Sequence, residues 1–238
     1  HPFPGENVKP NLLMYVKPKK ITNLDKRMKL VTWDDIRYKM CNVKTINLVP
    51  NILAAEHAVS LGCDEAVQIR DMLVTENGEI LRDAVTEGAH TNIFIVKDGK
   101  LVTAPLGSYI LPGIARKHVI ELCSEHGIDT EERYITRSEL FEADEILITS
   151  TTTLVRAACE LDGRPVGCRI RNLSTIFRLG ILKSLRMRQN NTKYGACLFF
   201  SDLHLFLQLY YNLQGCPTPL QAAASAYFLG GTVHYRNA

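Results

Sequence analysis

The sequence contains little that marks a metal site, a disulfide framework or a membrane anchor. Its seven cysteines are odd in number, scattered along the chain and never spaced as CxxC, and the seven histidines show no metal-ligand spacing. This pattern predicts no metal site and favours a reducing, cytoplasmic location. The apolar run at 197–211 is too short to span a bilayer and is interrupted by polar residues, so no membrane partner is expected.

Excess charge of either sign is also lacking, because the formal net charge is +3 over 238 residues. Such a balance gives no reason to expect nucleic acid as a partner. Acidic residues are almost missing from one end of the chain: residues 167–238 hold eight lysines and arginines but a single acid, Asp202. This break in composition predicts a basic and poorly ordered tail over residues 168–238.

What is present is a series of short β segments interleaved with a few helices. Alternation and short apolar runs predict strands at 29–33, 42–45, 66–69, 93–96, 101–104, 128–135, 145–149 and 154–161. Helical spacing predicts helices at 48–61, 114–126 and 137–143, the last with Thr136 as its N-cap. The Asn77-Gly78 and Asp98-Gly99 pairs predict tight hairpins. Together these elements predict an α/β (α+β) domain whose mixed sheet closes toward a barrel.

Lys44 lies within an otherwise apolar or small stretch, residues 41–48. If this stretch is a strand that faces a closed sheet, the amine loses solvent and its pKa falls. A neutral amine is the form that captures an aldehyde, so Lys44 is a candidate nucleophile. The plainer interpretation is a solvated lysine on an edge strand.

Glu87 follows Thr86 and precedes Gly88 on a predicted turn beside strands. A carboxylate in this position can hold the proton of a pyridinium ring, because opposite charges in contact favour both ionised forms. The alternative is a turn acid that caps its own backbone.

Two further stretches suit an anion. Gly113 opens a predicted helix together with Ile114 and Ala115, and the free N–H groups and dipole of a helix start suit a phosphate. The proline-glycine pair there is equally ordinary at the start of a helix. Ser150 and Thr151 belong to a run of hydroxyl residues after a strand, which either presents hydroxyls to an anion or forms a Ser/Thr turn.

The order of these stretches along the chain is more specific than any one of them. The sequence resembles the class IV (fold type IV) pyridoxal-phosphate aminotransferases, and among them the D-amino-acid (D-alanine) aminotransferases most. The resemblance runs from about residue 1 to residue 167. It rests on the segments 44–47, 85–88, 92–94, 111–116 and 149–152.

The resemblance implies a role for each candidate. Lys44 matches the lysine that binds pyridoxal 5'-phosphate covalently and then moves the substrate proton, and Glu87 matches the acid that pairs with the ring nitrogen. Gly113, Ile114 and Ala115 match the helix start whose backbone N–H groups bind the phosphate.

On the same basis, Ser150 and Thr151 match residues on the other side of the phosphate. His1 aligns with a histidine that helps to bind the substrate carboxylate. The resemblance divides the chain into an extended lead-in at 1–22, a cofactor-binding large domain at 23–167, and an aberrant tail at 168–238 outside the family pattern. It also implies that the smaller N-terminal domain of the family is missing from this sequence.

The function implied by the resemblance is transamination between an amino acid, with D-alanine or another D-amino acid favoured, and a 2-oxo acid such as 2-oxoglutarate. A homodimer is implied as well. Three alternatives stay open: a branched-chain L-amino-acid aminotransferase, an aminodeoxychorismate lyase, and an inactive fragment that only binds cofactor or dimerises.

Overall fold

The computed structural model describes residue 13 and residues 26–73, 80–167, 170, 174–177 and 179–180. The strands of this part are β1 Met28–Asp34, β2 Glu65–Leu73, β3 Ile80–Gly88, β4 Asn92–Lys97, β5 Lys100–Thr103, β6 Thr130–Glu132, β7 Ile135–Thr136, β8 Glu145–Ser150, β9 Leu154–Leu161 and β10 Arg164–Pro165. The helices are α1 Val49–Ser60, α2 Ile114–Glu125 and α3 Arg137–Glu142.

The described strands form one curled, open, mixed sheet in the order β6-β5-β4-β8-β9-β1-β2-β3-β7, with β10 added beside β9. The strand β1 runs parallel to both β2 and β9, and β5 runs parallel to β6, whereas the other pairs are antiparallel. Parallel neighbours need a crossover connection, which α1 provides between β1 and β2. The predicted mixed sheet is therefore confirmed.

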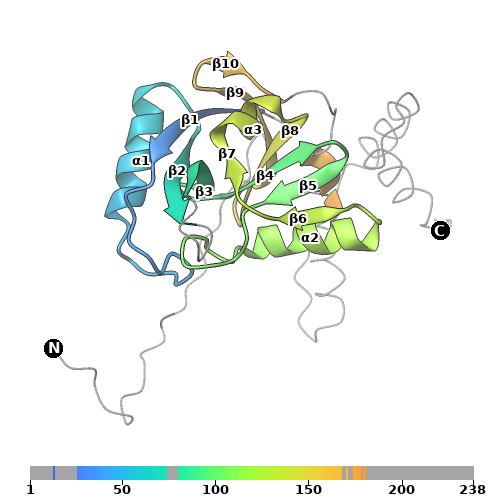
Figure 1. Cartoon of the computed structure of the whole chain (residues 1–238), viewed down its shortest axis with the longest axis horizontal. Helices are drawn as coiled ribbons and strands as arrows, with labels where there is room; N and C mark the ends of the chain where they lie inside the picture. Colours follow the sequence, from blue (N-terminus) through green and yellow to red (C-terminus); the bar gives the residue numbers. More distant parts are fainter. Residues whose placement is uncertain are drawn as a thin grey trace, which may run out of the picture.

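Helices cover the sheet from two sides. Figure 1 shows α1 along β1 and β2, and α2 at the other end of the molecule beside β6. The alternation along β4 places α2 and α3 on opposite faces, because Phe94 packs in one core cluster with residues of α2, whereas Ile93 and Ile95 face a second cluster with Leu140 of α3. Strands buried on both faces have continuous apolar runs, as this one does.

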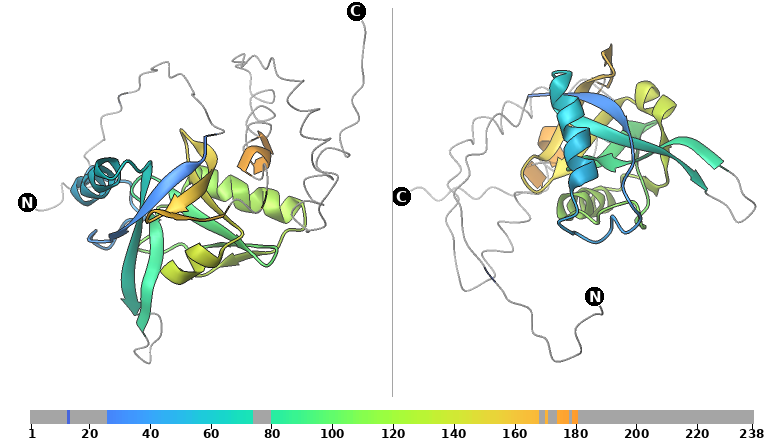
Figure 2. Two further views of the ribbon diagram at one scale, coloured as in Figure 1. Left: turned by 90° about the horizontal axis from the view of Figure 1, so that it is seen from above. Right: turned by 90° about the vertical axis from the view of Figure 1, so that its left-hand side faces the viewer.

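The hairpin predicted at Asp98-Gly99 lies where its turn residues indicated. Lys97 pairs with Lys100 across a two-residue loop, in which Asp98 and Gly99 have φ angles of +51° and +77°. Two positive φ angles are the mark of a tight hairpin turn of the primed type. The strands β2 and β3 form the second hairpin, which extends beyond the rest of the sheet in both views of Figure 2. The Asn77-Gly78 pair itself lies outside the described residues.

The predicted helices are confirmed within a residue or two at each end. α3 begins at a reciprocal capping box, as expected for Thr136: its hydroxyl accepts from the Glu139 N–H at 3.4 Å, and the Glu139 carboxylate accepts from the Thr136 N–H at 3.0 Å. No helix in the described ranges combines the length and apolar character needed to cross a membrane.

Two predicted strands are wrong. Residues 42–45 belong to the exposed loop between β1 and α1, where Met40 adopts a φ of +81° and its carbonyl accepts from the Val43 N–H. The local turn takes up the backbone groups that a strand would offer to a neighbour. Residues 128–135 are divided into β6 and β7, because the first pairs with β5 and the second with β3.

The outer segments fall mostly outside the described residues. The lead-in at 1–22 is represented by Leu13 alone, and His1 is not described. Beyond residue 167, Ile170 and Phe177 are buried in the cluster that includes Val119 and Leu122 of α2. The boundary of the tail at residue 168 stays a prediction, although these two side chains contribute to the core of the domain.

Cys123 offers a direct test of how tightly this cluster is packed. The thiol lies fully buried on α2, and burial raises its pKa to about 12. Because alkylation needs the thiolate, iodoacetamide at pH 8.5 should leave Cys123 unmodified in the native protein and modify it in denaturant. Peptide mapping measures both states, with half-buried Cys63 as the internal comparison. Equal native labelling of the two thiols contradicts the packing.

Candidate active site

A cavity of about 580 Å³ lies between the loop after β1, the turn from β3 to β4, the start of α2 and the end of β8. Four segments that are distant in sequence therefore line one cavity. Every predicted site residue among the described residues lines this cavity: Lys44, Glu87, Gly113, Ile114, Ala115, Ser150 and Thr151. His1 lies outside the described residues.

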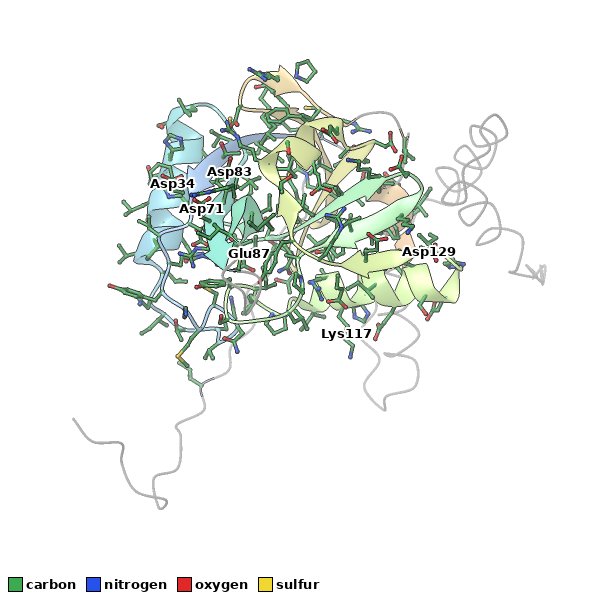
Figure 3. The ribbon with its side chains drawn as sticks, viewed as in Figure 1. Asp34, Asp71, Asp83, Glu87, Lys117 and Asp129 are labelled. Carbon is green, nitrogen blue, oxygen red and sulfur yellow. The ribbon has the colours of Figure 1, made fainter. Side chains whose placement is uncertain are left out.

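Glu87 lies within β3, near its end, and not on the predicted turn, and it is only 5% exposed. Figure 3 places it in the interior, whereas Lys117 and Asp129 lie at the periphery. Its carboxylate accepts on both oxygens: Oε1 from Arg37, and Oε2 from the Leu111 N–H at 2.9 Å. Burial raises the pKa of this carboxyl, although the charge of Arg37 and the Leu111 N–H oppose the rise. The alternative of a turn acid that caps its own backbone does not describe these contacts.

Arg37 is the residue that sequence reasoning missed. It is buried, and besides Glu87 it binds Asp35 through Nε at 2.9 Å and Nη2 at 2.8 Å. Asp35 is buried too, which by itself would raise its pKa, but the bonds and charge of Arg37 hold the pKa below the usual range. A signal was present, because Asp35 and Arg37 alternate directly after a strand, and alternate residues of an extended chain share a face.

A second arginine supports this buried group. The Arg70 guanidinium donates to the carbonyl oxygen of Arg37 at 3.2 Å and lies over the Tyr109 ring, 4.3 Å from its centroid. Contact of a guanidinium with a ring face is favourable. A network of two acids and two arginines therefore lies beside the cavity, and Arg37 and Glu87 are the members that line it.

Lys44 is placed differently from the prediction. It lies on the irregular loop between β1 and α1, and its side chain is exposed, so both the predicted strand and the predicted loss of solvent are wrong. It nevertheless lines the same cavity as Glu87 and Ser150. The apolar residues around it line the cavity or face outward instead of joining a sheet, as Val43 and the 98%-exposed Ile46 show.

The start of α2 is open toward the cavity. Gly113 is the N-cap, and no side chain caps this helix end among the described residues. Glycine is required there, because a Cβ would lie 2.1 Å from Oδ1 of Asn92. The first-turn N–H groups and the helix dipole thus remain available for an anion.

The end of β8 adds hydroxyl groups. Ser150 forms the Ser/Thr turn that was the alternative interpretation, since its Oγ accepts from the Thr153 N–H at 3.1 Å while the residue also lines the cavity. The preceding Thr149 is 1% exposed and lines the cavity, and its hydroxyl has no hydrogen-bond partner in the described structure. A buried, unsatisfied hydroxyl on a cavity wall is what a bound ligand or water would satisfy. In the described ranges, no three His, Cys, Asp or Glu side chains are grouped to hold a metal ion.

Known proteins are similar to this chain in both sequence and fold. The chain matches the family described as Amino-transferase class IV over residues 5–161. The D-alanine aminotransferase of Staphylococcus haemolyticus is 34% identical over 169 residues, which cover 70% of this chain and 56% of the relative. The D-alanine aminotransferase of Bacillus licheniformis is 37% identical over 137 residues, covering 58% of this chain and 44% of the relative. The chain thus spans about half the length of these relatives.

Solved structures agree with this result. The branched-chain aminotransferase of Thermoproteus uzoniensis, solved with norvaline, is similar at a TM-score of 0.59 and 28% identity, over 71% of this chain and 54% of that one. A branched-chain amino acid aminotransferase from T.th., solved with pyridoxamine 5'-phosphate, is similar at a TM-score of 0.58 and 28% identity, over 71% and 55%. Because the family match extends over most of the sequence and includes each described side of the cavity, the chain belongs to the class IV aminotransferase family.

Proposed function

We propose that this chain carries out pyridoxal-phosphate-dependent transamination between D-alanine, or another D-amino acid, and a 2-oxo acid such as 2-oxoglutarate. The observation that carries the proposal is the single cavity in which an amine, a buried acid, an open helix start and an unpartnered hydroxyl meet. When bound, pyridoxal phosphate supplies an aromatic ring that withdraws electrons from the substrate.

The residues of the cavity fit such a cofactor. Glu87 would hold the proton of the ring nitrogen, because Arg37 and the Leu111 N–H already fix its carboxylate. The N–H groups at the start of α2, with Thr149 and the nearby Ser150, would bind the phosphate. The cationic and anionic ends of the cofactor would therefore meet groups of opposite character.

Lys44 would provide the amine that attaches the cofactor and that takes and returns a proton at the substrate Cα. Its place on a loop that lines the cavity supports this role, since a four-carbon side chain there can reach several points of the cavity. The role proposed for His1, binding of the substrate carboxylate, rests on the resemblance alone.

The choice of substrate rests on the relatives. The curated relatives with 34% and 37% identity are D-alanine aminotransferases, and these values exceed the 28% shared with branched-chain aminotransferases of known structure. Branched-chain L-amino acids are the second candidate, which the likeness to those structures favours.

We also propose that the protein acts as a homodimer in the cytoplasm. Exposed apolar side chains on α1 and the preceding loop support the dimer, because such patches mark contact surfaces: Ile46, Leu48, Val49, Ile52 and Leu53. Cys41, Cys63 and Cys123 are free thiols, which supports a reducing compartment. Light scattering of the purified chain measures the oligomeric state.

Reductive trapping tests the function. The protein is mixed with pyridoxal phosphate, reduced with borohydride and digested, and mass spectrometry is expected to find the added mass on Lys44. Lys44→Ala should lose the label, whereas Lys39→Ala, which changes another exposed lysine of the same cavity-lining loop, should keep it. A label retained in Lys44→Ala contradicts the assignment.

Turnover separates the remaining alternatives. Formation of pyruvate from D-alanine and 2-oxoglutarate supports the proposed substrate, and turnover of L-leucine in its place supports the branched-chain candidate. A labelled Lys44 without turnover of either substrate leaves an aminodeoxychorismate lyase or an inactive chain that only binds the cofactor, and turnover of aminodeoxychorismate distinguishes these two.

A further inference from the structure

Asn92 lies at the junction of the segments that form the cavity. It begins β4, is 6% exposed and stands opposite Thr149 in the pairing of β4 with β8. Its Nδ2 group donates to Oε2 of Glu87 at 3.2 Å and to the carbonyl oxygen of Leu111 at 2.9 Å. One amide thus contacts the acid at the end of β3 and the segment that leads into α2.

The orientation of this amide follows from its neighbours. A carboxylate and a carbonyl oxygen both accept hydrogen bonds, so the NH₂ end must face them. The other end is equally confined, because Oδ1 lies so close to Gly113 that a Cβ on this residue would be 2.1 Å away. A flipped amide would place its oxygen against two acceptors.

These contacts set the distance between Glu87 and the start of α2. Glu87 and the start of α2 belong to separate elements, and two connections join them: the hydrogen bond from the Leu111 N–H to Glu87, and the Asn92 amide, which donates one hydrogen bond to each side. The first belongs to the backbone. The second depends on one side chain, so it can be removed by mutation without altering the chain path directly.

We infer that Asn92 is a positioning residue, which holds the Glu87 carboxylate at a fixed distance from the N-terminus of α2 so that one ligand engages both. The inference rests on the proposed function, because the ligand concerned carries a cationic ring nitrogen and a phosphate. Asn92 acts through Glu87 and Gly113, and contact between Asn92 and the ligand is not required.

The inference predicts a specific change in ligand preference. In Asn92→Ala, Glu87 and the Leu111 carbonyl each lose the hydrogen bond from the amide that joins them, so the two ends of the site can separate. Pyridoxal phosphate should then bind at least about tenfold more weakly, since hydrogen bonds to charged groups are among the stronger ones. Pyridoxal, which lacks the phosphate, should lose much less, because it uses only one end of the site.

A second variant keeps the shape and changes the charge. Asn92→Asp places another carboxylate beside Glu87, and like charges in contact favour protonation of one of them. The pH at which the absorbance of the bound cofactor changes should therefore rise relative to wild type. A residue that contributes packing alone would leave this pH unchanged.

The experiment compares wild type, Asn92→Ala, Asn92→Asp and Asn51→Ala by titration with pyridoxal phosphate and with pyridoxal, and by thermal unfolding. Asn51 is the matched control, because this asparagine also borders the cavity but its amide donates to the Ala89 carbonyl at 2.7 Å and does not contact Glu87. Loss of phosphate-dependent affinity in the Asn92 variants, with Asn51→Ala close to wild type, supports the inference.

Different results would contradict the positioning role and the proposed function. Asn92 variants that unfold at lower temperature yet retain wild-type affinity and spectral pH dependence overturn the positioning role, as does an equal effect of Asn51→Ala. A wild-type protein that shows neither binding nor a preference for the phosphate form overturns the proposed function itself.

Discussion

Changing Glu87 to glutamine should slow transamination by about a hundredfold to a thousandfold, in line with the loss of one preorganised charged contact at a reacting group. Glutamine keeps the length of the side chain but carries no charge to hold the proton of the ring nitrogen. Lys44 is untouched, so reductive labelling should persist while kcat falls. Steady-state kinetics with D-alanine and 2-oxoglutarate measure the effect.

The dependence on pH gives an independent test of the role of Glu87. Burial raises the pKa of Glu87 above its ordinary value of 4.5 in the cofactor-free protein, so protonation of this carboxylate should begin to weaken the binding of pyridoxal phosphate at a pH above 4.5 as the solution is acidified. In Glu87→Gln this acid-dependent weakening should disappear. Glu65→Gln is the control, because Glu65 is also a buried acid whose pKa burial raises, but it does not line the cavity. A normal rate in Glu87→Gln contradicts the role of the acid.

Changing Arg37 to methionine should lower the free energy of unfolding by about 3–5 kcal/mol at pH 7, because it leaves Asp35 and Glu87 as buried carboxylates without their main partner. Methionine fills much of the volume but neutralises neither acid. Denaturant unfolding measures the change. Arg82→Met is the control, since Arg82 pairs with Asp71 at a side-chain exposure of 73% and should change stability by less than about 0.5 kcal/mol.

The sign of the pH dependence follows from Asp35. In wild type its pKa is lowered, so its contribution to stability is present above the unfolded pKa of 3.8 and is lost as the pH falls through the folded value. Without Arg37, burial would raise that pKa instead, and protonation of Asp35 would remove the free-energy cost of a buried charge without a partner. The loss of stability should therefore shrink toward pH 4, and a loss that is independent of pH would argue against an uncompensated buried charge.

Local signals in the sequence predicted the elements well. The Asp98-Gly99 turn, the cap at Thr136 and the glycine that opens α2 each act within a few residues, so the short sequence context contains their cause. The predicted strand at 42–45 was wrong because a lysine between small and apolar residues is typical of a strand, whereas the turn at Met40 determines the path of the backbone there.

The network behind Glu87 could not be read in the same way. Arg37 is fifty residues from Glu87 in the chain, and the two meet because β1 and β3 both border β2 in the sheet. Pairing of that kind is settled by tertiary structure, which no local pattern encodes. The candidate acid was therefore found from its turn and from the family resemblance, while the arginine that fixes it was not.

The register of β4 against β8 links correct folding to the site. A slip by one residue would exchange Ile93 and Phe94 between opposite core clusters and would carry Asn92 away from Glu87 at the same time. Misregistered molecules would thus be unable to assemble the pocket. The amount of pyridoxal phosphate bound would then measure the correctly folded fraction of a preparation. The absorbance of the bound cofactor thus gives refolding studies a colorimetric readout.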